Sequence, residues 1–189
     1  MIKIGILGDI GSGKSYVAQN FGYPVFNADQ EVAKLYKQNK NVFNKLKKKL
    51  PNYIHIFPIE KKEITSAILA DKKNLRKIIK IVHLEIRKEM NFFFKKHQDK
   101  KIIILDIPLL LENKINKKND ILVYVQSDKL NILKRLKKRK NFNQRLLDKF
   151  KAIQYPINYK KKKSHFIIKN NFTKKSVKDG IKNILKEII

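Results

Sequence analysis

Residues 8–15 read Gly-Asp-Ile-Gly-Ser-Gly-Lys-Ser, and this segment constrains the fold of the chain more than any other. It matches the pattern G-x-x-x-x-G-K-[ST] and lies between an apolar run, residues 2–7, and a helix-compatible stretch, residues 15–21. A phosphate-binding loop requires this order of strand, loop and helix. Glycines let the backbone curl so that its N–H groups point at phosphate oxygens, and the N-terminus of the next helix adds partial positive charge. We therefore predict that this loop binds a nucleotide.

Four side chains are candidates for chemistry. In a loop of this kind Lys14 reaches the β- and γ-phosphates, and the Ser15 hydroxyl ligates Mg²⁺. Asp29 follows the second apolar run, at the sheet edge where ligands bind; it either orients an attacking hydroxyl or caps the next helix. Asp106 ends the third apolar run, and it either holds the Mg²⁺ shell through water or caps a turn before Pro108. The residues alone leave both alternatives open for each aspartate.

Five short apolar runs alternate with stretches of helical periodicity, which is typical of a doubly wound α/β fold. We predict a five-stranded parallel sheet with helices on both faces. Residues 27–101 are far more chain than one crossover needs, so we expect a mostly helical substrate-binding insert at approximately residues 30–98. Its apolar spacing predicts one helical face across residues 32–50 and a longer one across residues 75–94. The predicted strands are residues 2–7, 23–26, 102–105, 121–125 and 166–168.

Composition limits the classes of protein that remain. The chain has 189 residues, enough for one domain with a core, and it has no cysteine, which excludes disulfides and thiolate metal sites. Its formal net charge is +29, but the basic residues are mostly lysine, spread along the whole chain. We interpret the runs 47–49 and 160–163 as solvated faces or helix ends, and we expect no specific nucleic-acid partner. No apolar run is long enough to span a membrane, so we expect a cytoplasmic protein. We also expect it to be monomeric or weakly homo-oligomeric.

The loop and several later segments together resemble the dephospho-CoA kinase family. That family's loop looks like residues 8–15 of this chain, and its Asp-Ala-Asp is matched by Asn27-Ala28-Asp29. The ordered set of motifs runs from residue 2 to the C-terminus and is more specific than the loop alone. The other matching residues are His83-Leu84 for a His-Pro, Pro108-Leu109-Leu110-Leu111-Glu112 for a Pro-Leu-Leu-x-Glu, the spaced Arg135 and Arg139, Gln154, and Asn170 or Asn171.

The resemblance implies a fold, an activity and a set of site residues. The fold is that of P-loop kinases of the nucleoside-monophosphate-kinase type, with a short lid at approximately residues 139–147. The activity is transfer of the γ-phosphate of ATP, with Mg²⁺, to the ribose 3′-hydroxyl of dephospho-CoA. The residues implied are Asp29, Lys14 and Arg139 for catalysis; Gly11, Ser12, Gly13, Lys14, Ser15, Tyr16 and Arg135 for the nucleotide; Asp29, His83, Leu109 and Glu112 for the substrate; and Ser15 and Asp106 for the metal.

The chain departs from the family pattern at several positions. Asp9 replaces a usual glycine and puts a negative charge near the phosphates, so we expect weaker binding there. Asn27 replaces an acid, Leu84 replaces a proline and Lys140 stands where an aspartate is common. Tyr16 replaces a threonine, although its backbone N–H can still serve the α-phosphate.

Three alternatives to this activity differ in their sequence support. Another P-loop kinase for a nucleotide or small hydroxyl compound shares the loop, because the choice of acceptor lies in the helical insert. A nucleotide-dependent nucleic-acid-binding protein is suggested by the charge alone. A GTPase switch would carry Asn-Lys-x-Asp, whereas residues 116–119 read Asn-Lys-Lys-Asn.

Overall fold

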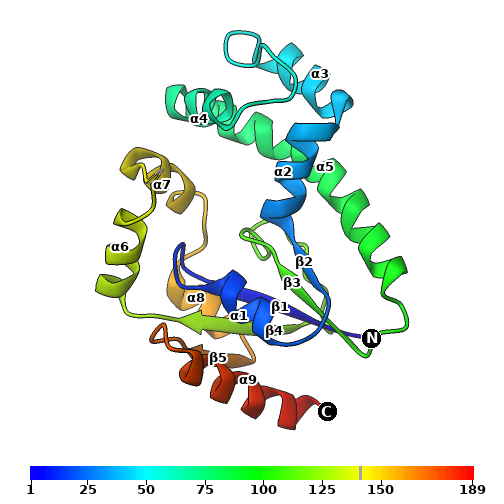
Figure 1. The fold of residues 1–189 in the computed structure, drawn as a ribbon, viewed down its shortest axis with the longest axis vertical. Helices are drawn as coiled ribbons and strands as arrows, with labels where there is room; N and C mark the ends of the chain where they lie inside the picture. Colours follow the sequence, from blue (N-terminus) through cyan, green and yellow to red (C-terminus); the bar gives the residue numbers. More distant parts are fainter. Residues whose placement is uncertain (141) are drawn as a thin grey trace. The chain divides into compact units, whose positions relative to one another are not determined.

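The computed structural model describes residues 1–140 and 142–189. Its strands form a five-stranded parallel sheet in the order β2-β3-β1-β4-β5, which Figure 1 shows with helices around it. The predicted fold class is confirmed, and each predicted apolar run overlaps a strand whose ends differ from those of the run by no more than two residues. The strands are β1 (Ile2–Gly8), β2 (Val25–Asn27), β3 (Ile102–Asp106), β4 (Ile121–Gln126) and β5 (Phe166–Lys169).

One face of the sheet is covered by α1 (Lys14–Asn20) and α9 (Lys174–Ile188). Ile4 and Ile6 of β1 share this face, because alternate residues of a strand point the same way. Both are fully buried, and they belong to one apolar cluster with Val17 of α1 and Val177 of α9. Burial of each such side chain stabilises the fold by about 1.5–3 kcal/mol. The cluster fixes α1, and therefore the start of the helix after the loop, against the sheet.

The opposite face is covered by α8 (Ile157–Lys163), which packs on β1 and β4, and by the chain that follows β3. Gly5 of β1 shows how close this covering lies. A Cβ at Gly5 would be 2.5 Å from Cδ2 of Leu110 and 3.0 Å from Cδ2 of Leu122. A larger residue at this position would therefore require the Leu110 side chain to move. Helix α8 was not predicted from the sequence.

The chain divides into two compact units. The first contains the sheet and comprises Met1–Asn27, His97–Phe142 and Ile153–Ile189. The second is helical and comprises Ala28–Lys96 and Asn143–Ala152. Its helices are α2 (Ala28–Gln38), α3 (Lys40–Lys49), α4 (Lys61–Ala70), α5 (Lys72–Lys96) and α7 (Gln144–Lys151).

The single helical face expected across residues 32–50 is divided between α2 and α3. Asn39 separates them, because its Oδ1 accepts a hydrogen bond from the Val42 N–H at 2.9 Å and so caps the N-terminus of α3. Leu35 and Leu46 are both buried, so the apolar positions were identified correctly although the break between the helices was not. The face expected across residues 75–94 lies on the single helix α5, where Leu75, Ile78, Val82 and Ile86 are buried.

Residues 139–147, predicted to form a lid, begin in the turn after α6 (Lys129–Lys137) and end within α7. Asn141 of this segment lies outside the described residues. The lid, like the substrate-binding role of the helical insert, stays a prediction. Among the helices of residues 1–140 and 142–189, none is both long enough and apolar enough to cross a membrane.

Candidate active site

The loop between β1 and α1 is shaped by glycines at its tightest points. Gly13 caps α1 with φ 90° and ψ 21°, in the left-handed region that side chains disfavour. A Cβ at Gly13 would lie 2.5 Å from Nδ2 of Asn170, and one at Gly11 would lie 3.0 Å from Cγ of Leu136 in α6. The loop is therefore packed between α6 and the segment after β5. Tyr16, one turn into α1, is exposed.

Ser12 is the most buried polar residue of the loop, at 1% exposure. Its carbonyl oxygen accepts hydrogen bonds from Ser127 Oγ and from Asn170 Nδ2, both at 2.9 Å. Of the two asparagines offered by the sequence analysis, Asn170 is thus the one that touches the loop, whereas Ser127 was missed because nothing in its neighbourhood forms a motif. The Ser12 hydroxyl is buried without a hydrogen-bond partner in the described structure. An orphaned buried hydroxyl in such a loop is suited to a polar ligand.

Lys14 turns its ammonium group back across the loop. Its Nζ donates to the carbonyl oxygens of Gly8 at 3.2 Å and of Asp9 at 2.8 Å. The positive charge is thereby held close to the amides that surround the predicted phosphate site. The role predicted for Lys14, a cation beside the terminal phosphates, stays a prediction.

Asp106 ends β3 and is 4% exposed. Its Oδ2 accepts a hydrogen bond from Asn27 Nδ2 at 2.6 Å, and Asn27 is the residue paired with it across β2 and β3. Burial raises the pKa of the Asp106 carboxyl above its usual value, while a hydrogen bond with Ser15, the charge of Lys14 and the Asn27 amide act in the opposite direction. The carboxylate and the Ser15 hydroxyl thus lie together at the carboxyl edge of the sheet.

These oxygen atoms suit Mg²⁺, which takes oxygen ligands and is held by the loop serine and an acid in P-loop enzymes. In the part of the chain that the structure describes, no three histidine, cysteine, aspartate or glutamate side chains form a metal-binding group. Ser15 and Asp106 are the side chains here that could hold a cation together with water or phosphate oxygens. Mg²⁺ uses few protein ligands and keeps water or phosphate oxygens, so the donor set fits.

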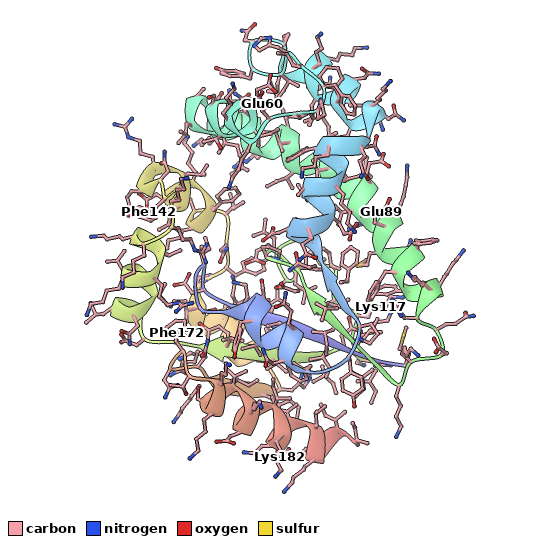
Figure 2. All side chains as sticks on the ribbon, in the orientation of Figure 1. Glu60, Glu89, Lys117, Phe142, Phe172 and Lys182 are labelled. Atoms are coloured by element: carbon pink, nitrogen blue, oxygen red, sulfur yellow. The ribbon has the colours of Figure 1, made fainter. Side chains whose placement is uncertain are left out.

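Arg135 lies on α6 and Arg139 in the turn that follows it, and both are exposed. The Arg135 guanidinium lies over the ring of Phe172, 4.4 Å from its centre, a cation–π contact; Figure 2 labels Phe172 in the segment between β5 and α9. The backbone N–H of Phe172 donates to Oδ1 of Asn170, the residue that holds the Ser12 carbonyl. Arg135 is thereby connected to the loop through Phe172 and Asn170, which lie in the same turn after β5.

Glu112 is engaged by a buried lysine. Lys160, at 3% exposure, places its Nζ 3.0 Å from Glu112 Oε1 and 2.8 Å from Gln154 Oε1. The Tyr155 N–H also donates to Glu112 Oε1, at 2.8 Å. Residues 160–163 form the last turn of α8, so their interpretation as a helix end is confirmed. Lys160 is buried there, whereas Lys162 and Lys163 are exposed. Leu109, in the same loop, is half-buried.

Two further candidates belong to the helical unit. Asp29 is exposed in the first turn of α2, two residues after the end of β2. His83 lies on α5, and its Nε2 is buried with no hydrogen-bond partner among the described residues. Burial, followed by the positive charge of Arg87, lowers the pKa of His83 below its usual value, which favours a neutral imidazole. Leu84, where the family pattern has proline, is 57% exposed within the unbroken helix.

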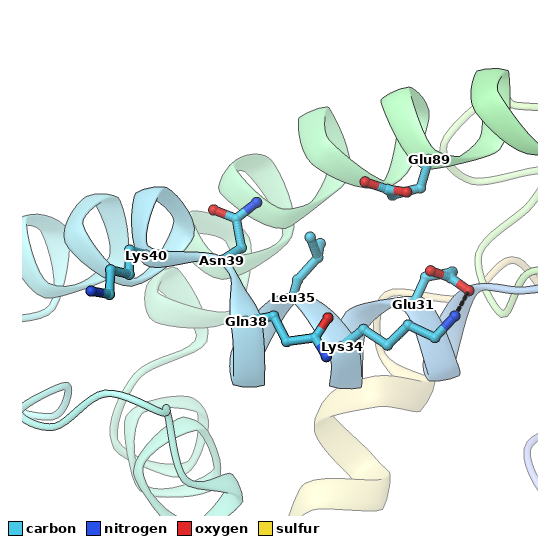
Figure 3. Close-up of a pocket in the computed structure, with 7 residues that line it drawn as sticks. All are labelled: Glu31, Lys34, Leu35, Gln38, Asn39, Lys40 and Glu89. Atoms are coloured by element: carbon cyan, nitrogen blue, oxygen red, sulfur yellow. Dashed lines mark hydrogen bonds and ion pairs between the residues drawn. The ribbon is translucent and has the colours of Figure 1, made fainter.

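The helical unit also contains a hollow of about 330 Å³ beside α2, the start of α3 and α5. Figure 3 shows its lining, in which Lys34 pairs with Glu31 at 2.7 Å and Glu89 approaches from α5. None of the predicted substrate-binding residues lines it. The lining residues are Glu31, Lys34, Leu35, Gln38, Asn39, Lys40 and Glu89.

The sequence matches one known protein family along most of its length. A sequence model of the family described as dephospho-CoA kinase matches residues 2–176. The chain belongs to the dephospho-CoA kinase family. Similar relatives include the dephospho-CoA kinases of Wolbachia pipientis wMel, 34% identical over 187 residues with 96% of this chain and 95% of the relative covered, and of Bartonella quintana, 29% identical over 192 residues with 97% and 98% covered.

Solved structures agree with this family at the level of the fold. A Thermus thermophilus protein superposes with a TM-score of 0.77 at 23% identity, covering 100% of this chain and 98% of that one. A dephospho-CoA kinase from Campylobacter jejuni gives a TM-score of 0.63 at 21% identity, covering 98% and 96%. As a member of the dephospho-CoA kinase family, the chain is a phosphotransferase that uses ATP to convert dephospho-CoA to coenzyme A.

Proposed function

We propose that the loop of residues 8–15, Asp106 and Asp29 are the groups with which this chain phosphorylates the ribose 3′-hydroxyl of dephospho-CoA. The observation that carries the proposal is the arrangement at the carboxyl edge of the sheet. The Lys14 ammonium, the unpartnered Ser12 hydroxyl and the hydrogen-bonded pair of Ser15 and Asp106 all belong to one small region of one unit. Cation, hydroxyls and acid are the parts that a phosphoryl-transfer site requires.

Within this proposal the loop holds the nucleotide. The amides of residues 11–16 bind phosphate oxygens, and Lys14 offsets the charge of the β- and γ-phosphates. Ser15 and Asp106 would hold Mg²⁺, which when bound neutralises charge on the same phosphates. The hydrogen bond from Asn27 keeps the Asp106 carboxylate turned toward the loop serine. Asn27 therefore supports the acid instead of acting as a second one.

Asp29 is assigned to the acceptor. A carboxylate there accepts the hydrogen bond of the 3′-hydroxyl and so orients its oxygen for in-line attack on the γ-phosphorus. Because the transition state of phosphoryl transfer is loose, orientation and charge stabilisation contribute more than removal of the proton. The exposure of Asp29 leaves it accessible to a substrate.

The arginines and the predicted lid are assigned to closure. Arg139 would approach the transferring phosphoryl group, while Arg135 binds the nucleotide and is steadied by its contact with Phe172. Closure of residues 139–147 would exclude water and so limit hydrolysis of ATP. His83, Leu109 and Glu112 remain the proposed substrate contacts, and the unpartnered Nε2 of His83 supports its place among them.

A coupled assay of ADP release tests the acceptor directly. Dephospho-CoA, AMP, CMP and shikimate are each supplied with ATP and Mg²⁺, and we expect turnover with dephospho-CoA alone. The Lys14→Ala variant serves as the control for contaminating kinases and should lose nearly all turnover. Equal or faster turnover with another acceptor would show that this chain differs in its substrate from its family.

A cytoplasmic location, a monomeric or weakly associated state and the lack of a specific nucleic-acid partner also stay predictions. Size-exclusion chromatography with light scattering measures the oligomeric state directly.

A further inference from the structure

Asp9 places a negative charge within the loop that no salt bridge among the described residues neutralises. In the described part of the chain no lysine, arginine or histidine nitrogen lies within 4.0 Å of its carboxylate, although the sequence carries 45 lysines and arginines. A basic protein with a polyphosphate site would be expected to use a neutral or positive residue there. The charge instead opposes the ligand that the loop binds.

The same side chain also helps to shape the loop. Its Oδ1 accepts a hydrogen bond from the Ile10 N–H at 2.7 Å. Its backbone carbonyl accepts from the Ser12 N–H at 3.2 Å and from Lys14 Nζ at 2.8 Å. The backbone of Asp9 is therefore held by two contacts within the loop, and its carboxylate is held by one.

The field of Asp9 reaches neighbouring groups. Burial, together with the negative charge of Asp9, raises the pKa of Tyr124 on β4 to about 12. A charge that affects a phenol on the next strand also acts on phosphates bound at the loop. The sign of that effect is repulsive, and its size grows with the charge of the ligand.

We propose that Asp9 is a specificity-determining residue that makes the loop prefer a nucleotide whose charge is partly neutralised by a divalent cation. Free ATP carries about four negative charges and its Mg²⁺ complex about two, so one fixed carboxylate penalises the free form about twice as much in free energy. The overall charge of +29 attracts every polyanion without distinction. The carboxylate of Asp9 makes the loop itself distinguish free ATP from its Mg²⁺ complex. The inference rests on the proposed nucleotide site and deepens it.

Binding measured without turnover tests the proposal. Isothermal titration calorimetry gives the Kd of ATP, without acceptor, in excess Mg²⁺ and in EDTA at the same ionic strength. Asp9→Asn keeps an oxygen for the Ile10 N–H but removes the charge. We expect it to bind the Mg²⁺ complex about threefold more tightly and free ATP about tenfold more tightly, so that the ratio of the two Kd values falls about threefold.

Two variants separate the alternatives. Asp179→Asn makes the same change in net charge on an exposed position of α9, and we expect it to leave the ratio unchanged. Asp9→Ala removes both the charge and the acceptor, and it should shift the ratio as Asp9→Asn does while binding both forms less tightly than Asp9→Asn. An unchanged ratio in Asp9→Asn, a shift in Asp9→Ala alone, or an equal shift in Asp179→Asn would each overturn the proposal.

The outcome for the unaltered protein distinguishes this inference from the function on which it rests. If the unaltered protein binds ATP and the ratio does not respond to Asp9, only the inference fails. If it binds ATP in neither condition, the proposed nucleotide site fails and the inference with it.

Discussion

Asp29 lies in the first turn of α2, exposed and outside the core. We expect Asp29→Asn to lower kcat by about two orders of magnitude or more, because the amide orients the acceptor hydroxyl poorly and cannot accept its proton. The KM for ATP should stay within about twofold, since the loop is untouched. Steady-state kinetics with both substrates measures kcat and the KM for ATP separately. A kcat near that of the unaltered protein would remove Asp29 from the mechanism.

Asp106 allows a test in which stability and activity move in opposite directions. Because burial raises its pKa in the native state, the native protein holds a proton there more tightly than the unfolded chain does. The stability that this proton contributes is fully present below the unfolded value of about 3.9 and is lost as pH rises through the native value. At pH 7 the charged carboxylate therefore lowers stability in the absence of ligand.

The side chain in Asp106→Asn is neutral at every pH, so this variant should not lose stability as the pH rises. We expect its Tm at pH 7 to exceed that of the unaltered protein by about 2–4 °C, with the difference shrinking as pH falls toward about 4. Its kcat should fall at least about tenfold, because the residue proposed to hold Mg²⁺ loses its charge. Differential scanning calorimetry across pH makes the comparison, with Asp179→Asn as the control. A lower Tm than that of the control at pH 7 would contradict the assigned pKa shift.

At the scale of elements, the buried pair of Lys160 and Glu112 joins α8 to the loop after β3. Removing one partner leaves the other charge buried and alone, so Lys160→Met should lower the free energy of unfolding by about 3–5 kcal/mol. The double variant Lys160→Met/Glu112→Leu should recover about 1–3 kcal/mol of that loss. Urea denaturation measures both.

The exposed pair of Lys62 and Glu60 is the matched control, with an Nζ–Oε2 distance of 2.8 Å. Lys62→Met should leave the urea midpoint unchanged, because solvent screens that pair. If Lys160→Met were equally mild, the Lys160 ammonium would have to be solvated and not buried.

Elements with a strong local pattern could be predicted from sequence, and those defined by distant partners could not. The strands were identified because parallel strands covered on both faces are continuously apolar. The break between α2 and α3 at Asn39 was not predicted, because the spacing of apolar residues carries no information about a capping side chain. The buried ion pair of Lys160 was not predicted, because its partner Glu112 lies 48 positions earlier in the sequence and only the fold brings the two together. In the site, the loop was predictable from its glycines, whereas Ser127 has no local signal.

For the whole molecule, the charge of +29 is distributed over many helices. Lysines occupy the last turns of α2, α3, α5, α6, α7 and α9, where a positive charge stabilises the helix dipole. The interpretation of residues 47–49 as a helix end is thereby confirmed. A structural use for these lysines favours a solvated basic surface over a dedicated nucleic-acid face.

We therefore expect DNA and RNA to bind only nonspecifically. Fluorescence anisotropy with a labelled duplex and a labelled single strand should show binding at about 0.02 M salt that is lost by about 0.2 M. Over the same range kcat/KM for dephospho-CoA should fall only several-fold, through weaker attraction of the substrate. Sequence-dependent binding that persists at about 0.2 M salt would contradict the expectation.

The two hydrogen bonds received by the Ser12 carbonyl have a consequence for the neighbouring amide. A peptide group is planar and trans, so fixing the direction of the Ser12 oxygen also fixes the direction of the Gly13 N–H on the opposite side. Ser127 and Asn170 follow the ends of β4 and β5. The direction of the Gly13 N–H in the loop is therefore set by residues at the ends of these two strands. The ordering of that donor is completed during folding, so an anion at the proposed phosphate site would bind it without further loss of conformational entropy.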